Sequence, residues 1–561
     1  MDLVPAHIEQ HDDAKSLKVW VSSDTSFAQT ARSGDGSFVA VAGTLLAGTS
    51  ADGMLRSWLD TGEGAIESWK FHGFVVACNT STGACVLARD RFGVEVGYFS
   101  ETPTGIVFSD DLLAVRDLGR ATTVDPLSLA VFLSTGYFVA PFTPFASVLK
   151  LEPGHLVHVA GRHFGTQTAW ARYGFSRTRS RADARGPMKE ALTNAISELW
   201  PTEGDAALLL SGGIDSAMLA VAIARYLDTT VPTYTFRYAE YDGVLNEGPR
   251  ARVIAQHLGL PHEEITIRPE QLISDLDAAV AAYREPFTWA IHSYRLEPVA
   301  RAGATVVFNG VGADGWGITQ RHKAALRFSR LPGFARSFIR LGVRMARPLG
   351  LSLQQKAEWT TRRVAGVAEL FSPSSAGTRQ LHRSLYQDPT IPDRGDRRLL
   401  DLFEATATNL EDDLERSLIY MNKLLSSAEA SLTWNRVWPL HYGMRACLPY
   451  YSPDVIEIGM NIEGDATGKD ILRDLAEDAL PTEVAQAPKL AQQMPISLWL
   501  RDPLSEAMRE RLSSLPEPMN DVFDGEEVAR LMAEHLEGHA DHGWLLFALM
   551  TIASLYRNVA G

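Results

Sequence analysis

Cysteine is scarce in this chain of 561 residues, which contains only Cys78, Cys85 and Cys447. Their spacing matches no metal-ligand pattern, and so few cysteines provide no disulfide framework. We therefore expect a reducing, cytoplasmic environment. Cys78 and Cys85 lie inside strand-like runs and are expected to be small core residues.

The sequence also lacks long apolar runs and any excess of positive charge. No stretch of 18 apolar residues occurs, so we predict no transmembrane helix and no stable membrane insertion. The first residues have neither a basic start nor an apolar core, and no signal peptide is predicted. A formal net charge of −15 argues against nucleic acid as the main partner.

A chain of this length is expected to form two domains. Two patterns of secondary structure do follow one another along the sequence. Residues 1–170 form short alternating runs separated by Gly, Asp, Ser and Thr, which predict antiparallel strands and hairpins. Residues 171–186 carry five arginines and one acidic residue and are predicted to be a linker. From residue 187 to 561, strand-length runs first alternate with helical stretches, which predicts a parallel sheet, and the remainder is mostly helical.

The segment ALLLSGGIDSAMLAVAIARYL begins with a predicted strand, Ala207–Leu210, and ends with a predicted helix, Ala217–Leu227. The loop between this strand and this helix contains Gly212 and Gly213, which let the backbone approach a ligand. It does not contain the Walker pattern GxxxxGK[ST]. The start of the following helix presents free N–H groups to an anion. The simpler alternative is a tight strand-to-helix turn with a capping side chain.

Polar side chains in the same loop favour the anion-binding interpretation. The hydroxyls of Ser211 and Ser216 add donors. The carboxylate of Asp215 beside a phosphate site is explained by a Mg²⁺ ion between the two.

This strand–SGGIDS–helix segment resembles the SGGxDS pyrophosphate loop of the N-type ATP pyrophosphatases. The resemblance implies cleavage of ATP between its α- and β-phosphates. It also implies contacts to ATP from Leu210, Ser211, Gly212, Gly213, Asp215 and Ser216. Downstream, the segments TYTFRYAEYDGVLNEGPRARVIAQHLGLPHEEITI, YREPF and VVFNGVGADGWG resemble the asparagine synthetase family. That resemblance implies an adenine contact near Phe236, a nucleotide contact at Gly310, and Asp314 as a second Mg²⁺ ligand. An Asx turn among glycines is the alternative for Asp314.

Two lysines complete the implied site. Residues 468–500 resemble the closing segment of the asparagine synthetase family, in which Lys469 and Lys489 match the lysines that hold the triphosphate and pyrophosphate. Fixed ammonium groups stabilise the charge that gathers on departing pyrophosphate more in the transition state than in the ground state. A lysine taken alone is more often a solvated surface charge.

The N-terminal half resembles the glutaminase domain of asparagine synthetases at residues 87–93, 107–111 and 133–159. The implied fold is an N-terminal-nucleophile-hydrolase-like antiparallel sandwich, followed by an α/β ATP-pyrophosphatase domain with helical additions. Glutamine-using relatives expose a nucleophilic Cys as residue 2, where this chain has Asp2. We therefore expect a domain without glutaminase activity.

Three features bear on which reaction is catalysed. Val311 stands where asparagine synthetases place Glu and β-lactam synthetases place Tyr. Glu429 lies in the region where β-lactam synthetases carry a catalytic Glu, and the alternative is a surface helix residue. A basic insert, residues 321–363, contains eleven Lys or Arg and one acidic residue. The spacing of Phe334, Phe338, Leu341 and Met345 predicts an apolar helical stripe. The alternatives for it are a solvated helix docked by its apolar side, a surface for an acidic peptide or partner protein, and a membrane-surface contact.

These observations predict an ATP- and Mg²⁺-dependent amide-bond synthetase. We favour an intramolecular lasso-peptide macrolactam cyclase of natural-product biosynthesis. The alternatives are a β-lactam synthetase, an ammonia-dependent asparagine synthetase or other amide ligase, and a non-catalytic scaffold. The expected partners are a small-molecule or peptide substrate, such as a precursor peptide with its leader protease, and a homo-oligomer is left open.

Overall fold

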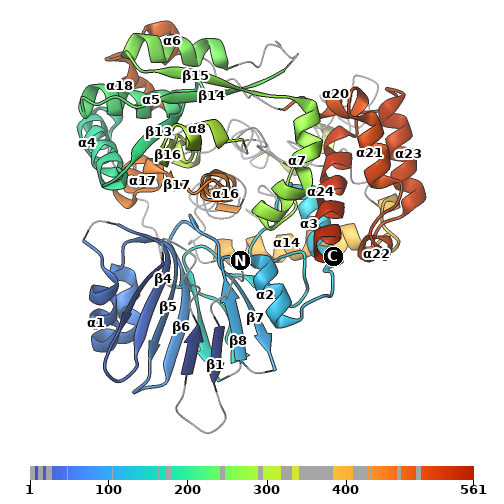
Figure 1. Cartoon of the computed structure of the whole chain (residues 1–561), viewed down its shortest axis with the longest axis horizontal. Coiled ribbons are helices and arrows are strands. Elements are labelled where there is room, and N and C mark those ends of the chain that lie inside the picture. The colour runs from blue at the N-terminus through green and yellow to red at the C-terminus, as the bar shows by residue number, and fades with distance from the viewer. Residues whose placement is uncertain are drawn as a thin grey trace. The chain divides into compact units, whose positions relative to one another are not determined.

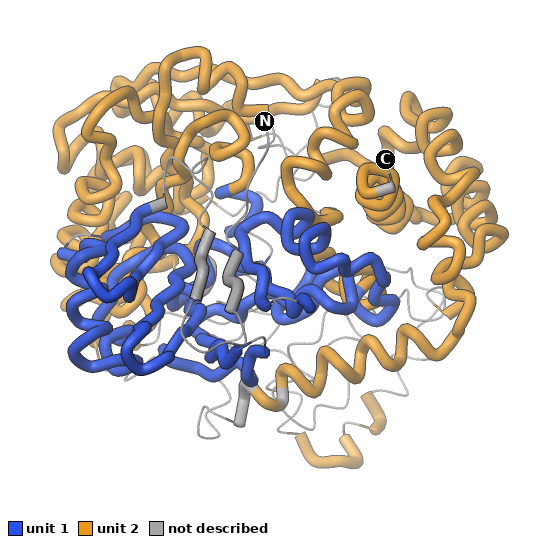
Figure 2. Tube along the Cα trace, turned by 60° about the horizontal axis from the view of Figure 1, so that its bottom comes forward, with its two compact units in different colours: residues 1–128, 138–174, 424–436 blue, residues 129–137, 175–423, 437–561 orange. Residues whose placement is uncertain are grey.

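The computed structural model describes most of the chain. The described residues are 7–10, 17–20, 28–46, 48–103, 105–161, 163–171, 179–239, 247–288, 295–316, 327, 331–335, 337–339, 383–408, 428–429, 432–463, 469–487 and 494–560. The chain divides into two compact units, which Figure 2 shows in different colours. Unit 1 comprises residues 1–128, 138–174 and 424–436, and unit 2 comprises residues 129–137, 175–423 and 437–561.

Unit 1 contains two antiparallel sheets (Figure 1). The first has the order β2-β1-β8-β7-β9, with bounds Leu17–Trp20, His7–Gln10, Gly105–Ser109, Tyr98–Thr102 and Leu149–Lys150. The second has the order β11-β10-β6-β5-β4-β3, with bounds His163–Phe164, His155–Ala160, Ala84–Arg89, Phe71–Asn79, Phe38–Leu45 and Ala28–Arg32. A short strand, β12 (Thr168–Ala169), also pairs with β10. The predicted antiparallel, strand-rich architecture is confirmed.

Side chains from both sheets share one apolar core in unit 1. Phe74 of β5 meets Phe108 of β8 edge to face, with ring centroids 6.2 Å apart. Both belong to a buried cluster that also holds Val76, Leu87 and Phe99. The helices of this unit are α1 (Ala51–Thr61), η1 (Gly62–Ser68) and α2 (Leu112–Gly119), and α3 (Pro126–Thr135) runs from unit 1 into unit 2. β5 is buried from Phe71 to Cys78, because its other face packs with α1 in a second apolar cluster.

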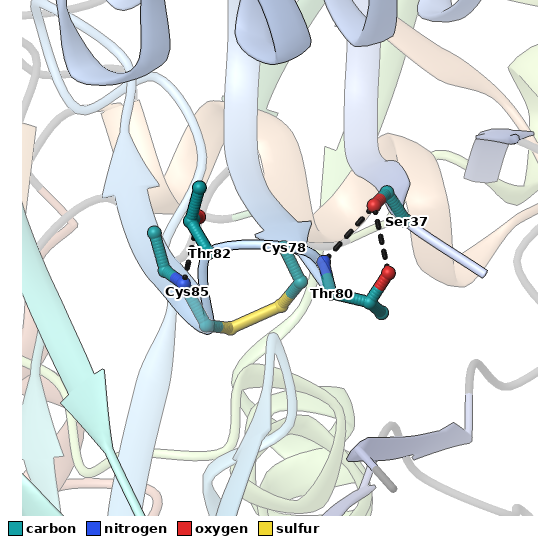
Figure 3. The surroundings of a disulfide bond; sticks show 6 residues. Ser37, Cys78, Thr80, Thr82 and Cys85 are labelled. Carbon is teal, nitrogen blue, oxygen red and sulfur yellow. Dashed lines mark hydrogen bonds between the residues drawn. A yellow bond between two sulfur atoms is a disulfide. The ribbon is translucent and has the colours of Figure 1, made fainter. Parts of the chain in front are cut away.

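Two of the three cysteines form a disulfide, which corrects the expectation that the chain contains none. Cys78 of β5 and Cys85 of β6 are register partners with Cα atoms 4.1 Å apart, and their sulfur atoms are bonded (Figure 3). Both are buried, so their assignment to strands and to the core is confirmed. The spacing of the cysteines could not reveal the bond, because it depends on the register of the hairpin.

Unit 2 is built on a parallel sheet, as predicted. Its order is β15-β14-β13-β16-β17, with bounds His262–Ile267, Thr233–Tyr238, Asp205–Leu209, Ala304–Asn309 and Arg445–Cys447. The chain proceeds from β13 towards β15 on one side and later adds β16 and β17 on the other. Ligands of open parallel sheets bind where the strand order reverses in this way, at the carboxyl ends of the strands. Here that position lies beyond β13 and β16.

Helices surround this sheet and extend beyond it (Figure 1). Those associated with the strands are α4 (Arg181–Leu199), α5 (Ile214–Val221), η2 (Ala222–Tyr226), α6 (Gly248–Leu258), α7 (Pro269–Tyr283), α8 (Glu297–Arg301) and η4 (Ala313–Trp316). Those that follow are α14 (Ile391–Thr408), α16 (Thr433–His441), η8 (Pro449–Tyr451), α17 (Pro453–Met460), α18 (Asp470–Glu477), α19 (Thr482–Ala485), α20 (Ile496–Arg501), α21 (Ser505–Leu512), α22 (Glu517–Asn520), α23 (Gly525–Leu536) and α24 (Gly543–Ala560). None of the helices described is both long and apolar enough to cross a membrane.

The last six residues of the predicted linker, 181–186, are helical. Helix α4 begins at Arg181, and the Ser180 side chain caps it by accepting a hydrogen bond from the Asp183 N–H. Arg181 forms ion pairs with Asp470 and Asp474. Arg181 therefore pairs with acidic residues that lie almost 300 positions further along the chain, which the composition of the linker could not indicate.

Candidate active site

The loop that follows β13 is held closed by its own hydroxyl groups. Ser216 Oγ accepts a hydrogen bond of 3.1 Å from the N–H of Ser211, and the Oγ atoms of these two residues lie 3.1 Å apart. Ser211 Oγ also accepts a bond of 3.3 Å from the N–H of Gly213. Leu210 is buried, and its N–H donates to the carbonyl of Tyr234 in β14. The predicted strand, loop and helix are all present, but the helix begins at Ile214 rather than Ala217, so Asp215 and Ser216 lie in its first turn.

Glycine is required at two positions around this loop. Gly212 has φ +73°, and a Cβ there would lie 3.0 Å from the backbone N of Ala251 at the start of α6. A Cβ at Gly310, directly after β16, would lie 2.7 Å from the backbone N of Ser216. The loop after β16 therefore approaches the start of α5 more closely than any other residue type would permit.

The start of α5 has the features of an anion site. Its N-cap, Gly213, provides no side-chain hydrogen bond to the first turn. The first N–H groups of a helix have no partner within the helix and carry the positive end of its dipole. A phosphate group placed at this end would satisfy both requirements.

Lys469 and Asp215 form an ion pair at the same place. Lys469 Nζ donates to Asp215 Oδ2 over 2.5 Å, and the two side chains are only 11% and 19% exposed. Lys469 is the N-cap residue of α18, where the helix dipole disfavours a cation, so the Asp215 carboxylate offsets an otherwise unfavourable position. Two of the sequence-predicted residues are thus brought together.

Tyr450 supports the same aspartate and was not identified from the sequence. Its hydroxyl donates to the backbone carbonyl of Asp215 over 2.8 Å. Burial raises the pKa of Tyr450 well above its usual value, with a smaller contribution from Asp215, so the phenol stays protonated. The signal in the sequence was weak: Tyr450 follows β17, which pairs in parallel with β16 at the edge of the same sheet.

The structure describes only some of the other residues predicted to contact the nucleotide. Phe236 is buried in β14, two residues past Tyr234, the last residue of that strand in register with β13. Asp314 lies on η4, which follows β16 after the turn at residues 310–312, but its side chain is outside the described residues, as is the whole of Lys489. Val311 lies in the turn between β16 and η4, where its N–H donates to Asn309 Oδ1.

The donor set favours a metal ion bound jointly with phosphate. Among the described residues, no three His, Cys, Asp or Glu side chains are grouped as a metal site. Asp215 offers one carboxylate, and the parallel pairing of β13 with β16 brings η4, which carries Asp314, to the same edge of the sheet. Hard carboxylate oxygens completed by phosphate oxygens and water fit Mg²⁺, which rarely takes an all-protein cage.

Glu429 lies in unit 1, in a fully buried ion-pair cluster. Its Oε1 accepts from Arg89 Nη1 over 2.7 Å and its Oε2 from Lys150 Nζ over 2.9 Å. All three side chains have no exposed surface. Burial acts to raise the pKa of Glu429, but the charges and hydrogen bonds of Lys150 and Arg89 outweigh it and lower the pKa. The carboxylate is therefore held ionised by two cations, and it is not the surface helix residue considered as the alternative.

None of the three cysteines offers a thiolate. Cys78 and Cys85 are bonded to each other. Cys447 is buried, donates weakly to the carbonyl of Leu199, and has its pKa raised to about 12 by burial. Because the thiolate is the nucleophile, none of these residues is placed for covalent attack.

The described part of the basic insert is helical and exposes its apolar side chains. Residues 333–335 and 337–339 are helical, and Phe334 and Phe338 are 73% and 75% exposed. The expectation of a helix docked by its apolar side is therefore wrong for these two phenylalanines. Leu341 and Met345, the rest of the predicted stripe, lie outside the described residues.

Two family models match the chain. Residues 188–557 match the model described as asparagine synthase, and residues 44–170 match the model described as a glutamine amidotransferase domain. The two matches correspond to the parallel-sheet region and to the antiparallel sheets.

Among curated relatives, the chain is similar to asparagine synthetase [glutamine-hydrolyzing] 1 of Bacillus subtilis (strain 168). Identity is 22% over 480 residues, covering 82% of this chain and 73% of the relative. It is also similar to the asparagine synthetase [glutamine-hydrolyzing] of Pongo abelii, at 25% identity over 261 residues. That match covers 43% of this chain and 44% of the relative, so the chain spans less than half of its length.

Solved structures provide more distant likenesses. An NMN synthetase from Francisella tularensis is 19% identical, with a TM-score of 0.19 over 25% of this chain and 57% of that one. A U34-tRNA thiolase from Methanococcus maripaludis is 14% identical, with a TM-score of 0.19 over 43% of this chain and 80% of that one. These likenesses are too distant to bear on function.

Proposed function

Since the chain belongs to the asparagine synthase family, we propose that it is an ATP-dependent amide ligase. A substrate carboxylate attacks the α-phosphorus of ATP and pyrophosphate leaves. An amine then attacks the activated carbonyl carbon, forms the amide, and releases AMP. The observation that carries this proposal is the Ser211–Ser216 loop at the uncapped start of α5, next to the Asp215–Lys469 pair.

The residues at this loop have separate tasks in the proposed reaction. The N–H groups at the start of α5 and the Ser211 and Ser216 hydroxyls bind the departing pyrophosphate. The ammonium of Lys469 stabilises the charge that develops there, and it exchanges the Asp215 carboxylate for phosphate oxygens as ATP binds. Fixed donors of this kind lower the barrier because they are already oriented before reaction.

The metal and the second half of the phosphate site are part of the same proposal. Asp215 and Asp314 would hold Mg²⁺, which neutralises phosphate charge when bound. Lys489 would add a second ammonium group beside Lys469. Gly310 keeps the loop after β16 close to the start of α5, and the backbone near Phe236 would contact adenine.

We propose further that the amine does not come from glutamine. Glutamine hydrolysis in this family's glutaminase domain needs a nucleophilic thiolate, and all three cysteines of this chain are disulfide-bonded or buried with a raised pKa. The amine would then belong to the substrate, as in a lasso-peptide macrolactam cyclase. A β-lactam synthetase and an ammonia-dependent asparagine synthetase remain the alternative ligases.

A peptide substrate is favoured over a small amino acid by the basic insert. Phe334 and Phe338 are exposed one helical turn apart, and arginines are frequent in the surrounding sequence. Such a surface suits a peptide that carries apolar and acidic side chains. A precursor peptide and its leader protease are therefore the proposed partners, within natural-product biosynthesis.

Mass spectrometry of the reaction products tests the proposal. The purified protein is incubated with Mg-ATP and either aspartate with ammonium chloride, or peptides that contain a free N-terminal amine and an Asp or Glu side chain. We expect AMP, pyrophosphate and a peptide lighter by one water, and no asparagine. Formation of asparagine would contradict the cyclase proposal while supporting the ligase. Loss of ATP binding would favour the non-catalytic scaffold, whereas ATP binding without products would mean that the carboxylate and amine belong to a different substrate.

A further inference from the structure

A cavity of about 480 Å³ lies in unit 2, away from the Ser211–Ser216 loop. Its walls come from α4, from η2 at the end of α5, and from the end of α18. Figure 1 shows α4, α5 and α18 on the same side of the parallel sheet's unit. The side chains that define its chemistry are Arg185, Lys189, Arg225, Tyr226, Leu475 and Asp478.

The cavity concentrates positive charge in an acidic protein. Three of its side chains are cations, and of the residues that line it only Asp478 is an acid. Arg185 Nη2 donates to Asp478 Oδ2 over 2.6 Å, but the two side chains are 40% and 68% exposed, so solvent screens the pair. A multivalent anion entering the cavity would meet a net positive wall in a chain whose formal charge is −15.

The remaining wall is aromatic and apolar. Lys189 Nζ lies 4.0 Å from the centroid of the Tyr226 ring, which places a cation directly against an aromatic surface. Leu475 is buried at the same site. The volume falls within the range of small-molecule sites and exceeds what a bare inorganic anion fills. A ligand with both a ring and an anionic group therefore fits better than either part alone.

A π-helical turn supplies two of the cavity residues. Helix α5 changes at Ala222 into η2, and the Leu227 N–H bonds to the carbonyl of Ala222 five residues earlier. Arg225 and Tyr226 lie on this widened turn. This turn ends the helix, as π turns at helix C-termini commonly do, and it places both side chains on the wall of the cavity.

The cavity is distinct from the proposed ATP site. Helix α5 begins at the loop and reaches Tyr226 only after roughly 18 Å of helix. Helix α18 likewise begins after Lys469 and ends at Glu477, next to Asp478. The two helices start at the loop and finish at the cavity, so one ligand cannot occupy both places.

We propose that this cavity is a second ligand site, for a small phosphate monoester that carries a flat ring. The phosphate contacts Arg185, Lys189 and Arg225, and the ring packs against Tyr226 and Leu475. The phosphate competes with Asp478 for the Arg185 guanidinium. Binding at this site does not depend on the ligase reaction.

Calorimetry with phenyl phosphate tests the site, with phenol and inorganic phosphate as partial ligands at constant ionic strength. The wild type should bind one equivalent of phenyl phosphate saturably and phenol not at all. Lys189→Met should weaken binding about tenfold, whereas Lys70→Met, at an exposed lysine of unit 1, should not change it. Asp478→Asn should strengthen binding, because it removes the competing carboxylate. Circular dichroism checks that each variant is folded.

Three results would overturn the proposal. The first is the absence of saturable binding by the wild type. The second is binding that Lys469→Met abolishes and Lys189→Met spares, because the ligand would then occupy the Ser211–Ser216 loop. The third is equal affinity for inorganic phosphate and phenyl phosphate, which would exclude a contact with the ring.

Discussion

Lys469 donates a hydrogen bond of 2.5 Å to Asp215 across 254 positions of sequence. The pair joins the start of α18 to the first turn of α5, the helix that begins at Ile214 within the Ser211–Ser216 loop. Each charge neutralises the other in a place where solvent is largely excluded. In the proposed reaction, ATP would replace the carboxylate partner of Lys469 with phosphate oxygens, and the ion pair already orients the lysine.

Replacing Lys469 with Met should abolish most of the turnover. Loss of one donor that stabilises developing charge typically costs about 10²- to 10³-fold in rate. Steady-state release of pyrophosphate measures the loss, and Lys70→Met is the matched control because its side chain is exposed in unit 1. Turnover within threefold of wild type in the Lys469 variant would remove this residue from the mechanism.

Replacing Gly310 with Ala should destabilise unit 2. The new Cβ would lie 2.7 Å from the backbone N of Ser216, and the loop after β16 would have to move away from α5. Overpacking of this kind costs about 1–3 kcal/mol. Urea unfolding of the variant measures the cost, and Gly525→Ala, where a Cβ meets nothing within 4 Å, is the control. Equal stability of the two variants would contradict the close approach.

Replacing Glu429 with Gln should destabilise the protein through unit 1. The change leaves Arg89 and Lys150 buried without their carboxylate. Breaking one partner of a buried ion pair costs about 3–5 kcal/mol. Thermal unfolding tests this against Glu517→Gln, at an exposed position. Unchanged stability together with lost turnover would instead support the catalytic role that the sequence led us to consider.

The stability of the protein should depend on the ionisation of Glu95. Burial raises the pKa of Glu95 from 4.5 to about 7, opposed by Arg436 and reinforced by Asp110 and Asp90. The folded protein thus holds this proton more tightly than the unfolded chain does. The stability that protonated Glu95 contributes to the folded protein is fully present below pH 4.5. It is lost as the pH rises through about 7. The free energy of unfolding of Glu95→Gln should vary less than that of the wild type between pH 5 and pH 8, which are about the limits of this window. Equal slopes would contradict the raised pKa.

Thiol counting tests the disulfide, and a separate ammonia assay tests the absence of glutaminase chemistry. Alkylation of the unfolded protein without reductant should label only Cys447, and after reduction it should label all three cysteines. The native protein should release no ammonia from glutamine. Ammonia release at a rate matching amide formation would show that another group replaces the thiolate.

The sequence predicted local features well and long-range pairings poorly. The Ser211–Ser216 loop could be recognised because its strand, glycines, hydroxyls and helix are contiguous. The partners of Glu429 could not, because Arg89 lies 340 positions away and Lys150 lies 279 away. Tyr450 was missed for the same reason, since it reaches Asp215 only through the pairing of β17 with β16.

The ³¹P NMR spectrum of ATP products tests the central claim most directly. The protein is incubated with Mg-ATP and the peptide and aspartate–ammonium substrates, beside its Asp215→Asn variant and the exposed control Asp521→Asn. Wild type and the control variant should convert ATP to AMP and pyrophosphate in amounts equal to the amide formed, and Asp215→Asn should not. Formation of ADP and phosphate, or full activity of Asp215→Asn, would contradict the assignment of this loop as the pyrophosphate site.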